Sequence, residues 1–308
     1  MVKVNELIEG VPQVLFRSSD GGYTPGVVLV DENGDTSPAV KFIDENDVSY
    51  GVKHVSNKPR VSSTPYYVDI AEGNIADHQA VYKFGNNESA GTTEQSIWAE
   101  GGLYPWDAID SASGTVTASS SSAQDNPSGT GIATIQIYGI NADTGEDQNE
   151  VLIMNGQTAV SSTLSYKRVF RIICRTSGSA STTDKNIGII YVGTGAISTG
   201  KPAVVWALVP VGRNQTLQAV WTVPAGKTFS MTDASFSVGG AKGAEGVMYV
   251  RPPGELFQVK FLSHHAGGVD VIPFTFPLRF SAGTDIDMRA TAIANSTEIT
   301  STFSGWYE

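Results

Sequence analysis

The chain has 308 residues, which is enough for one large domain or two ordinary ones with a real hydrophobic core. Its 20 basic and 31 acidic residues give a net charge of -11, which disfavours nucleic acid or an anionic membrane as a partner. The single cysteine, Cys174, excludes an internal disulfide framework and a cysteine-built zinc site, and the 4 histidines leave few general bases or metal ligands.

The opening residues, MVKVNELIEG, lack the basic start, apolar run and small-residue cleavage site of a secretory signal, so we expect none. No stretch approaches the ~18 consecutive apolar residues that a membrane helix needs. We therefore expect no membrane partner and assembly in the cytoplasm of the cell that makes the chain.

Residues 1–65 are predicted to form an extended N-terminal arm or a small hairpin subdomain. Two β-type segments, 27–31 and 39–43, flank an Asn-Gly dipeptide, which favours a tight hairpin turn. Two strands alone are marginal in water, so this segment is expected to gain stability by docking on the body or on a partner. Val27 and Phe42 are its candidate interface residues.

The most concentrated aromatic cluster lies in residues 98–106, which we call the aromatic loop. Trp98, Tyr104 and Trp106 alternate there with glycine and proline, and such a rigid loop buries a large area at little entropic cost. This profile is typical of an interface anchor, so these residues are candidate interface residues. The same rings would line a sugar-binding face if they were exposed, or belong to the core if they were not.

Residues 111–131 (SASGTVTASSSSAQDNPSGTG) are predicted to be a flexible loop or linker. Serine and glycine supply little apolar surface to offset the entropy lost on ordering.

The remaining pattern is that of an all-β chain. Residues 132–138 and 285–292 alternate apolar and polar side chains, which predicts half-buried strands with Asp285 and Asp287 on the solvent face. Many short strands separated by glycine-rich turns predict a β-sandwich, jelly-roll-like body. We divide it into regions 66–200 and 201–308, which form either one extended sandwich or two.

No catalytic motif stands out in the sequence. A nucleophile elbow, a phosphate-binding loop and a zinc-binding helix motif are all missing. His264 and His265 are adjacent and point to opposite faces of a strand, which makes shared metal binding difficult. Cys174 lies in an apolar run, as an inert buried thiol does. We therefore expect no enzyme activity, no cofactor and no metal.

Several short segments resemble structural proteins of tailed bacteriophages, especially marine ones. They are YYVDIAEGN (66–74), YKFG (82–85), TEQSIW (93–98), TVPAGKTF (222–229) and AGTDIDMRATA (282–292). The resemblance implies a virion component such as a capsid decoration protein, a head fibre or a tail accessory subunit. Such proteins are typically all-β, often homotrimeric and assembled in the host cytoplasm, with the major capsid protein or other virion proteins as partners.

The leading hypothesis is thus a virion structural protein that decorates or projects from the capsid, anchored by residues 1–65. One alternative is a carbohydrate-binding tail fibre or adhesin that uses the aromatic loop on a host glycan. A second alternative is a glycan-degrading enzyme with Asp69, Glu72 or Asp107 as its acids, although nothing in the sequence selects these carboxylates over their neighbours.

Overall fold

The computed structural model describes residues 65–240 and 242–308 in full and, before residue 65, only the backbone of short strands. The chain divides into two compact units, Met1–Ala76 and Asp77–Glu308. The candidate interface residues Val27 and Phe42 have side chains outside the described part of the structure. The anchoring role expected for residues 1–65 rests on this same part of the chain and stays a prediction. No helix in the fully described ranges is long and apolar enough to cross a membrane.

In the first unit, the described residues form two small antiparallel sheets and one helix. Strand β1 (Gln13–Val14) pairs with β2 (Val28–Leu29), and β3 (Lys41–Ile43), β4 (Ser49–Val55) and β5 (Lys58–Ser62) form a 3-stranded sheet. The β2 and β3 segments were expected to pair as a hairpin, but each pairs with another strand. Helix α1 (Tyr66–Ala71) follows Pro65.

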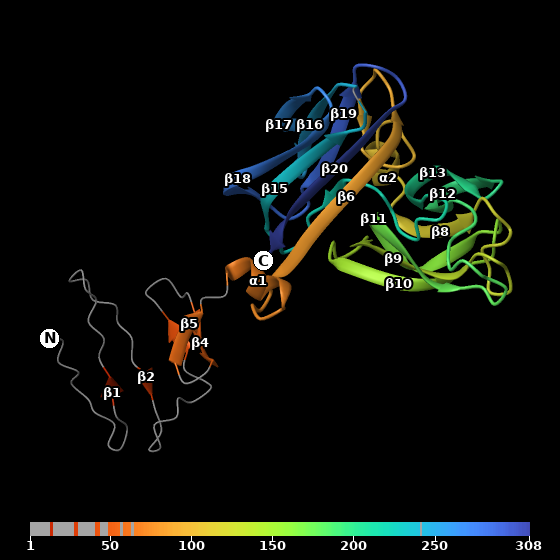
Figure 1. The fold of residues 1–308 in the computed structure, drawn as a ribbon. Coiled ribbons are helices and arrows are strands. Elements are labelled where there is room, and N and C mark those ends of the chain that lie inside the picture. Colours follow the sequence, from red (N-terminus) through yellow and green to blue (C-terminus); the bar gives the residue numbers. More distant parts are fainter. Residues whose placement is uncertain are drawn as a thin grey trace. The chain divides into compact units, whose positions relative to one another are not determined.

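One half of the second unit is a β-sandwich of two antiparallel sheets (Figure 1). The 4-stranded sheet has the order β18-β15-β20-β6 and consists of β6 (Gln79–Ala90), β15 (Phe229–Val238), β18 (Gly268–Phe280) and β20 (Thr297–Tyr307). The 5-stranded sheet consists of β7 (Gln95–Ser96), β14 (Val220–Thr222), β16 (Ala244–Arg251), β17 (Gln258–His265) and β19 (Asp285–Ala292). Both sheets contribute to one core, which includes Phe229, Phe236, Met248, Met288 and Phe303.

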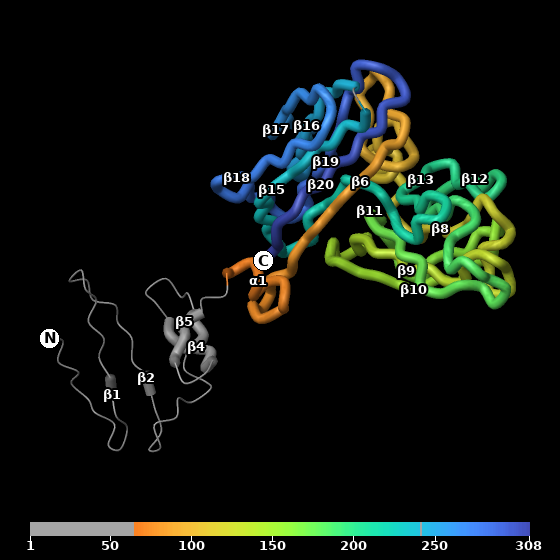
Figure 2. Tube along the Cα trace, viewed as in Figure 1, coloured from red at the N-terminus to blue at the C-terminus, as the bar shows by residue number. Residues whose placement is uncertain are grey.

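The other half is a 6-stranded antiparallel sheet with the order β10-β9-β11-β8-β12-β13. Its strands are β8 (Gly114–Ser120), β9 (Ile132–Asn141), β10 (Asp147–Ile153), β11 (Val160–Ser177), β12 (Ile190–Ser198) and β13 (Lys201–Val209). Inward side chains from β9, β11, β12 and β13 gather in one core cluster, which also includes Trp98, Tyr104 and Trp106. Figure 2 traces the chain from β6 of the sandwich into the 6-stranded sheet and back to the sandwich. The short helix α2 (Trp106–Asp110), labelled in Figure 1, lies in the first of these two connections.

The predicted all-β, sandwich-type fold is confirmed, but the chain is divided differently from the expected regions 66–200 and 201–308. Strand β6, from the first of these regions, pairs along its length with the C-terminal strand β20. Strand β13, from the second, completes the 6-stranded sheet. The sandwich is therefore built from both ends of the second unit, with the 6-stranded sheet inserted between them.

The prediction of a flexible linker at residues 111–131 is wrong. Strand β8 lies inside the 6-stranded sheet, between β11 and β12. Its Ser119 and Ser120 are buried, and their hydroxyls donate to the Gly200 carbonyl and to the Asp125 carboxylate. These buried hydrogen bonds stabilise an ordered conformation of the segment, although it has few apolar side chains.

Candidate functional site

The aromatic loop packs inside the chain rather than on its surface. Trp98, Tyr104 and Trp106 are at most 4% exposed. Their rings meet edge to face, with centroids 5.0 Å apart between Trp98 and Tyr104 and 4.8 Å apart between Tyr104 and Trp106. The Tyr104 hydroxyl donates to the Trp206 carbonyl of β13 at 2.8 Å. These rings thus connect the sandwich to the 6-stranded sheet, and they leave no aromatic face open to a sugar or another subunit.

A charged junction surrounds Trp106 and comprises Asp110, Arg168, Arg251, Asp285, Asp287 and Arg289. The Trp106 indole N–H donates to Asp287 at 2.9 Å, and Arg289 Nε donates to the same carboxylate oxygen at 2.8 Å. The guanidinium groups of Arg168 and Arg251 lie over the Trp106 ring, 5.2 and 5.5 Å from its centroid. Burial raises the pKa of Asp287, and the Arg289 charge opposes the shift.

Asp285 connects strands from both halves of the second unit at this junction. It accepts hydrogen bonds from Arg251 of β16 at 2.6 Å and from Arg168 of β11 at 3.4 Å. Asp110 of α2 pairs with the same two arginines, at 2.5 Å to Arg168 and 2.8 Å to Arg251. The prediction that Asp285 and Asp287 face solvent is wrong, because the junction covers the face of β19 opposite the core.

The other residues considered for chemistry do not form a common site. Asp69 of α1 and Glu72, which follows the helix, both accept from the Asn74 side-chain amide. Asp107 of α2 is fully exposed and lies 3.7 Å from Arg251 of the junction. Burial raises the pKa of Cys174 to about 12, with a further contribution from Asp125. Within residues 65–240 and 242–308, no group of 3 or more His, Cys, Asp or Glu is placed to hold a metal ion.

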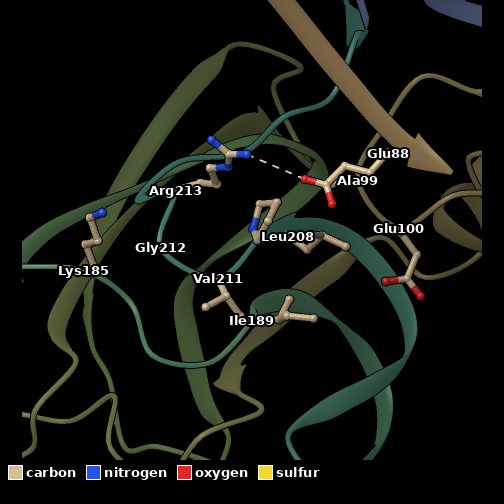
Figure 3. Close-up of a pocket in the computed structure, with 10 residues that line it drawn as sticks. Glu88, Ala99, Glu100, Lys185, Ile189, Leu208, Val211, Gly212 and Arg213 are labelled. Atoms are coloured by element: carbon tan, nitrogen blue, oxygen red, sulfur yellow. Dashed lines mark ion pairs between the residues drawn. The ribbon is translucent and has the colours of Figure 1, made fainter. Parts of the chain in front are cut away.

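A cavity of about 510 Å³ opens between β6, β13 and the loop that follows β13 (Figure 3). Its lining includes the apolar side chains of Ile189, Leu208 and Val211. Glu88 and Arg213 form an ion pair across it at 3.8 Å, both largely exposed. Glu100 pairs with Lys201, whereas Lys185 is exposed at the cavity and has no ion pair with a described residue.

A second hollow, of about 320 Å³, lies between the first half of β6 and the outer face of the 6-stranded sheet; we call it the β6 groove. Its lining includes Tyr82, Tyr138, Asp147, Asn149 and Arg171. Sequence reasoning missed this groove, because the strands that form it are far apart in the chain. No local motif brings Tyr138 and Arg171 together; the pairing of β9 with β11 does.

Apolar side chains also line the free edges of the sandwich. Strands β17 and β18 are the outermost strands of their sheets and follow each other directly in the chain (Figure 1). Val269, Val271 and Phe276 of β18 are 71%, 61% and 82% exposed, and Val259 and Leu262 of β17 are about half exposed. We call these five residues the apolar strip.

Comparisons with known proteins add little to this description. No protein-family model matches the chain, and no curated protein matches it either. A structure of infectious bursal disease virus, Gx strain, is 10% identical with a TM-score of 0.20, covering 75% of this chain and 71% of that chain. The VP2 subviral particle of the same virus is 9% identical with a TM-score of 0.18, covering 79% and 77%. Similarity at this level carries no argument about function.

Proposed function

We propose that this chain is a structural protein of the virion of a tailed phage, which decorates or projects from the capsid as a homotrimer. In this proposal it acts through its surfaces and not as an enzyme, and residues 1–65 anchor it to the major capsid protein or another virion protein. The resemblance of several segments to phage structural proteins supports the class. The observation that carries the proposal is the apolar strip.

Several exposed apolar side chains on two consecutive edge strands of a folded protein are typical of a surface that another molecule covers. The strip also lies on free sheet edges, where unpaired backbone groups would promote uncontrolled strand pairing. Pro273 and Pro277 lie within β18 and lack the backbone N–H that a continuous ladder needs. A partner would therefore dock through side chains, in a closed assembly and not an open-ended sheet.

The charges beside the strip favour a second copy of the chain as the partner. Lys260 of β17 and Asp270 of β18 both lack an ion-pair partner among the described residues. In a cyclic oligomer, each contact joins two different surfaces, so Lys260 of one copy would face Asp270 of the next. A trimer closes with this contact repeated and leaves no strip uncovered.

The test is to replace Val271 and Phe276 by serine and to measure the mass of the purified chain in solution by light scattering. We expect a trimer for the unchanged chain and a monomer for the double variant. The double variant should still fold and unfold cooperatively on heating, because both replaced side chains are exposed. The control is serine at Val151 and Ile153, two exposed residues of β10, which should stay trimeric. A monomeric parent chain, or a double variant that remains trimeric, would contradict the proposal.

A further inference from the structure

We propose that the β6 groove binds a saccharide that carries a carboxylate, with its ring against Tyr82 and Tyr138 and its acid group paired with Arg171. This inference is independent of the proposed assembly, since the groove and the apolar strip share no residue. The aromatic loop, which the alternative of a carbohydrate-binding adhesin would use, is buried and does not offer such a site.

The floor of the groove is one row of side chains across the 6-stranded sheet. In the register of β10, β9 and β11, Asn149 lies opposite Tyr138, and Tyr138 lies opposite Arg171. Neighbouring side chains in such a row project from the same face of a sheet. An amide, an aromatic ring and a guanidinium are thereby aligned along the groove.

Arg171 supplies a fixed positive charge with no partner. Its guanidinium has no hydrogen bond or ion pair with any residue of the described ranges, although it lines the groove. Lys83, beside it, donates to the Phe170 carbonyl at 2.7 Å, and burial together with Arg171 lowers its pKa well below the usual value. A guanidinium presents a planar fork that matches a carboxylate, so one acid group of a ligand fits here.

Tyr82 provides the open aromatic surface on the β6 side. It is 58% exposed, and its ring is tilted 36° to that of Phe84 with the centroids 6.0 Å apart. A half-exposed ring beside polar groups suits a pyranose, whose C–H faces are apolar and whose rim carries hydroxyls. The Asn149 amide and the Asp147 carboxylate line the same groove and can donate to and accept from such hydroxyls.

The walls of the groove are tied together in the free chain. The Tyr307 hydroxyl of β20 contacts both the Gln79 amide oxygen of β6 and the Asp147 carboxylate of β10, the latter at 2.8 Å. Behind it, the Tyr307 ring stacks on Trp221 with centroids 6.2 Å apart. A preformed site avoids the entropic cost of ordering on binding.

Charge and size argue against other anionic ligands. A single unpaired guanidinium beside Asp147, in a chain with a net charge of -11, disfavours a phosphate-rich polymer. The volume of about 320 Å³ is at the lower end of the range for small-molecule sites and suits one or two sugar rings. An acidic peptide is the competing occupant, and the experiment includes it.

The experiment titrates the full chain with tetragalacturonate, a hyaluronan tetrasaccharide, the methyl ester of tetragalacturonate and a tetraglutamate peptide, by calorimetry. We expect at least one acidic saccharide to bind, and the ester to bind about tenfold more weakly than its acid, because it lacks the charge-assisted pair with Arg171. Binding of neither acidic saccharide, equal binding of acid and ester, or a preference for the peptide would overturn the inference.

Variants then locate the site. Tyr82→Ala and Arg171→Gln should each weaken binding of the acidic saccharide about tenfold, and Arg171→Lys should recover part of the loss. The matched controls are Tyr67→Ala, a similarly exposed tyrosine on α1, and Arg213→Gln in the other cavity. Both should bind as the parent chain does, with unfolding transitions confirming that every variant folds. Unchanged affinity in Tyr82→Ala and Arg171→Gln would place the ligand elsewhere and contradict the proposal.

Discussion

Asp110 and Asp287 both belong to the charged junction, yet their pKa values shift in opposite directions. Burial raises the pKa of both carboxyl groups, but at Asp110 it is outweighed by the pairing with Arg168 and Arg251, which lowers the pKa below 3.8. At Asp287 burial prevails over Arg289, and the pKa is raised. The difference follows from position, since Asp110 is partly exposed and shared by two arginines whereas Asp287 is fully buried.

These directions set the sign of each contribution to stability. A carboxylate whose folded pKa lies below its unfolded value stabilises the fold above the unfolded pKa, and this stabilisation is lost as the pH falls through the folded pKa. Asp110 is of this kind. Asp287 is the reverse, because its raised pKa favours the fold below the unfolded value and this gain is lost as the pH rises. The free energy of unfolding of the whole chain therefore contains contributions that rise with pH and others that fall with pH. A variant of one carboxyl group is needed to separate them.

We predict that Asp110→Asn lowers the free energy of unfolding at about pH 6 and that its difference from the parent chain shrinks at about pH 3. The reason is that the variant lacks the ionised group which Arg168 and Arg251 favour in the fold. Urea unfolding at both pH values measures the difference. Asp107→Asn, a fully exposed carboxylate on the same helix that lies 3.7 Å from Arg251, is the control and should change the free energy of unfolding much less than Asp110→Asn at both pH values. A gap for Asp110→Asn that is constant with pH would contradict the assignment.

At the scale of the element, the segment from β8 to β9 depends on one buried carboxylate. Asp125 accepts backbone N–H bonds from Ile132 and Ile187, both at 3.0 Å, and from Gly188 at 2.8 Å. It also accepts the Ser120 hydroxyl at 2.6 Å. A residue in the turn thereby fixes the start of β9 and the approach to β12, which orders a segment that has few apolar side chains.

We predict that Asp125→Ala lowers the free energy of unfolding by at least about 3 kcal/mol, because it leaves several buried donors without an acceptor. Denaturant unfolding is the measurement. The control is Asp143→Ala, an exposed acid in the turn between β9 and β10, which should change stability by less than about 0.5 kcal/mol. A loss for Asp125→Ala as small as that of the control would show that the segment is held by other contacts.

Strand β19 shows how far period-two alternation predicts burial and where it stops. The pattern correctly places Ile286 and Met288 in the core, where both are fully buried. It also places Asp285 and Asp287 in solvent, which is wrong because arginines from other strands cover that face. Alternation reports which side chains share a face, but not whether a polar face is later covered by charges of opposite sign. Whether a polar face is covered depends on contacts with other strands, which the local sequence does not reveal.

The β6 groove illustrates the same limit for a site. The strand pattern around Tyr138 was recognisable, and β9 is present at Ile132–Asn141. The alignment of Asn149, Tyr138 and Arg171 depends on the register of β10, β9 and β11, with bulges along β11. A shift by one residue would turn these side chains to the other face. The site is therefore a product of strand pairing, which composition and motifs do not reveal.

At the scale of the whole molecule, the residues that stabilise the fold differ from those that form the proposed contact surfaces. Buried aromatics and ion pairs hold the two halves of the second unit together, whereas the apolar strip and the β6 groove are surfaces that remain available. The first unit, Met1–Ala76, is compact by itself. We accordingly expect a chain lacking residues 1–65 to keep the unfolding transition of the second unit.

The most direct measurement counts copies of this chain in purified phage particles by quantitative mass spectrometry, with the full chain and with a chain lacking residues 1–65 supplied in its place. We predict that the full chain is present in a fixed number of copies relative to the major capsid protein. We also predict that the shortened chain, though folded, is lost from the particles. Absence of the full chain from particles would contradict the virion role itself, and equal occupancy by both chains would contradict anchoring through residues 1–65.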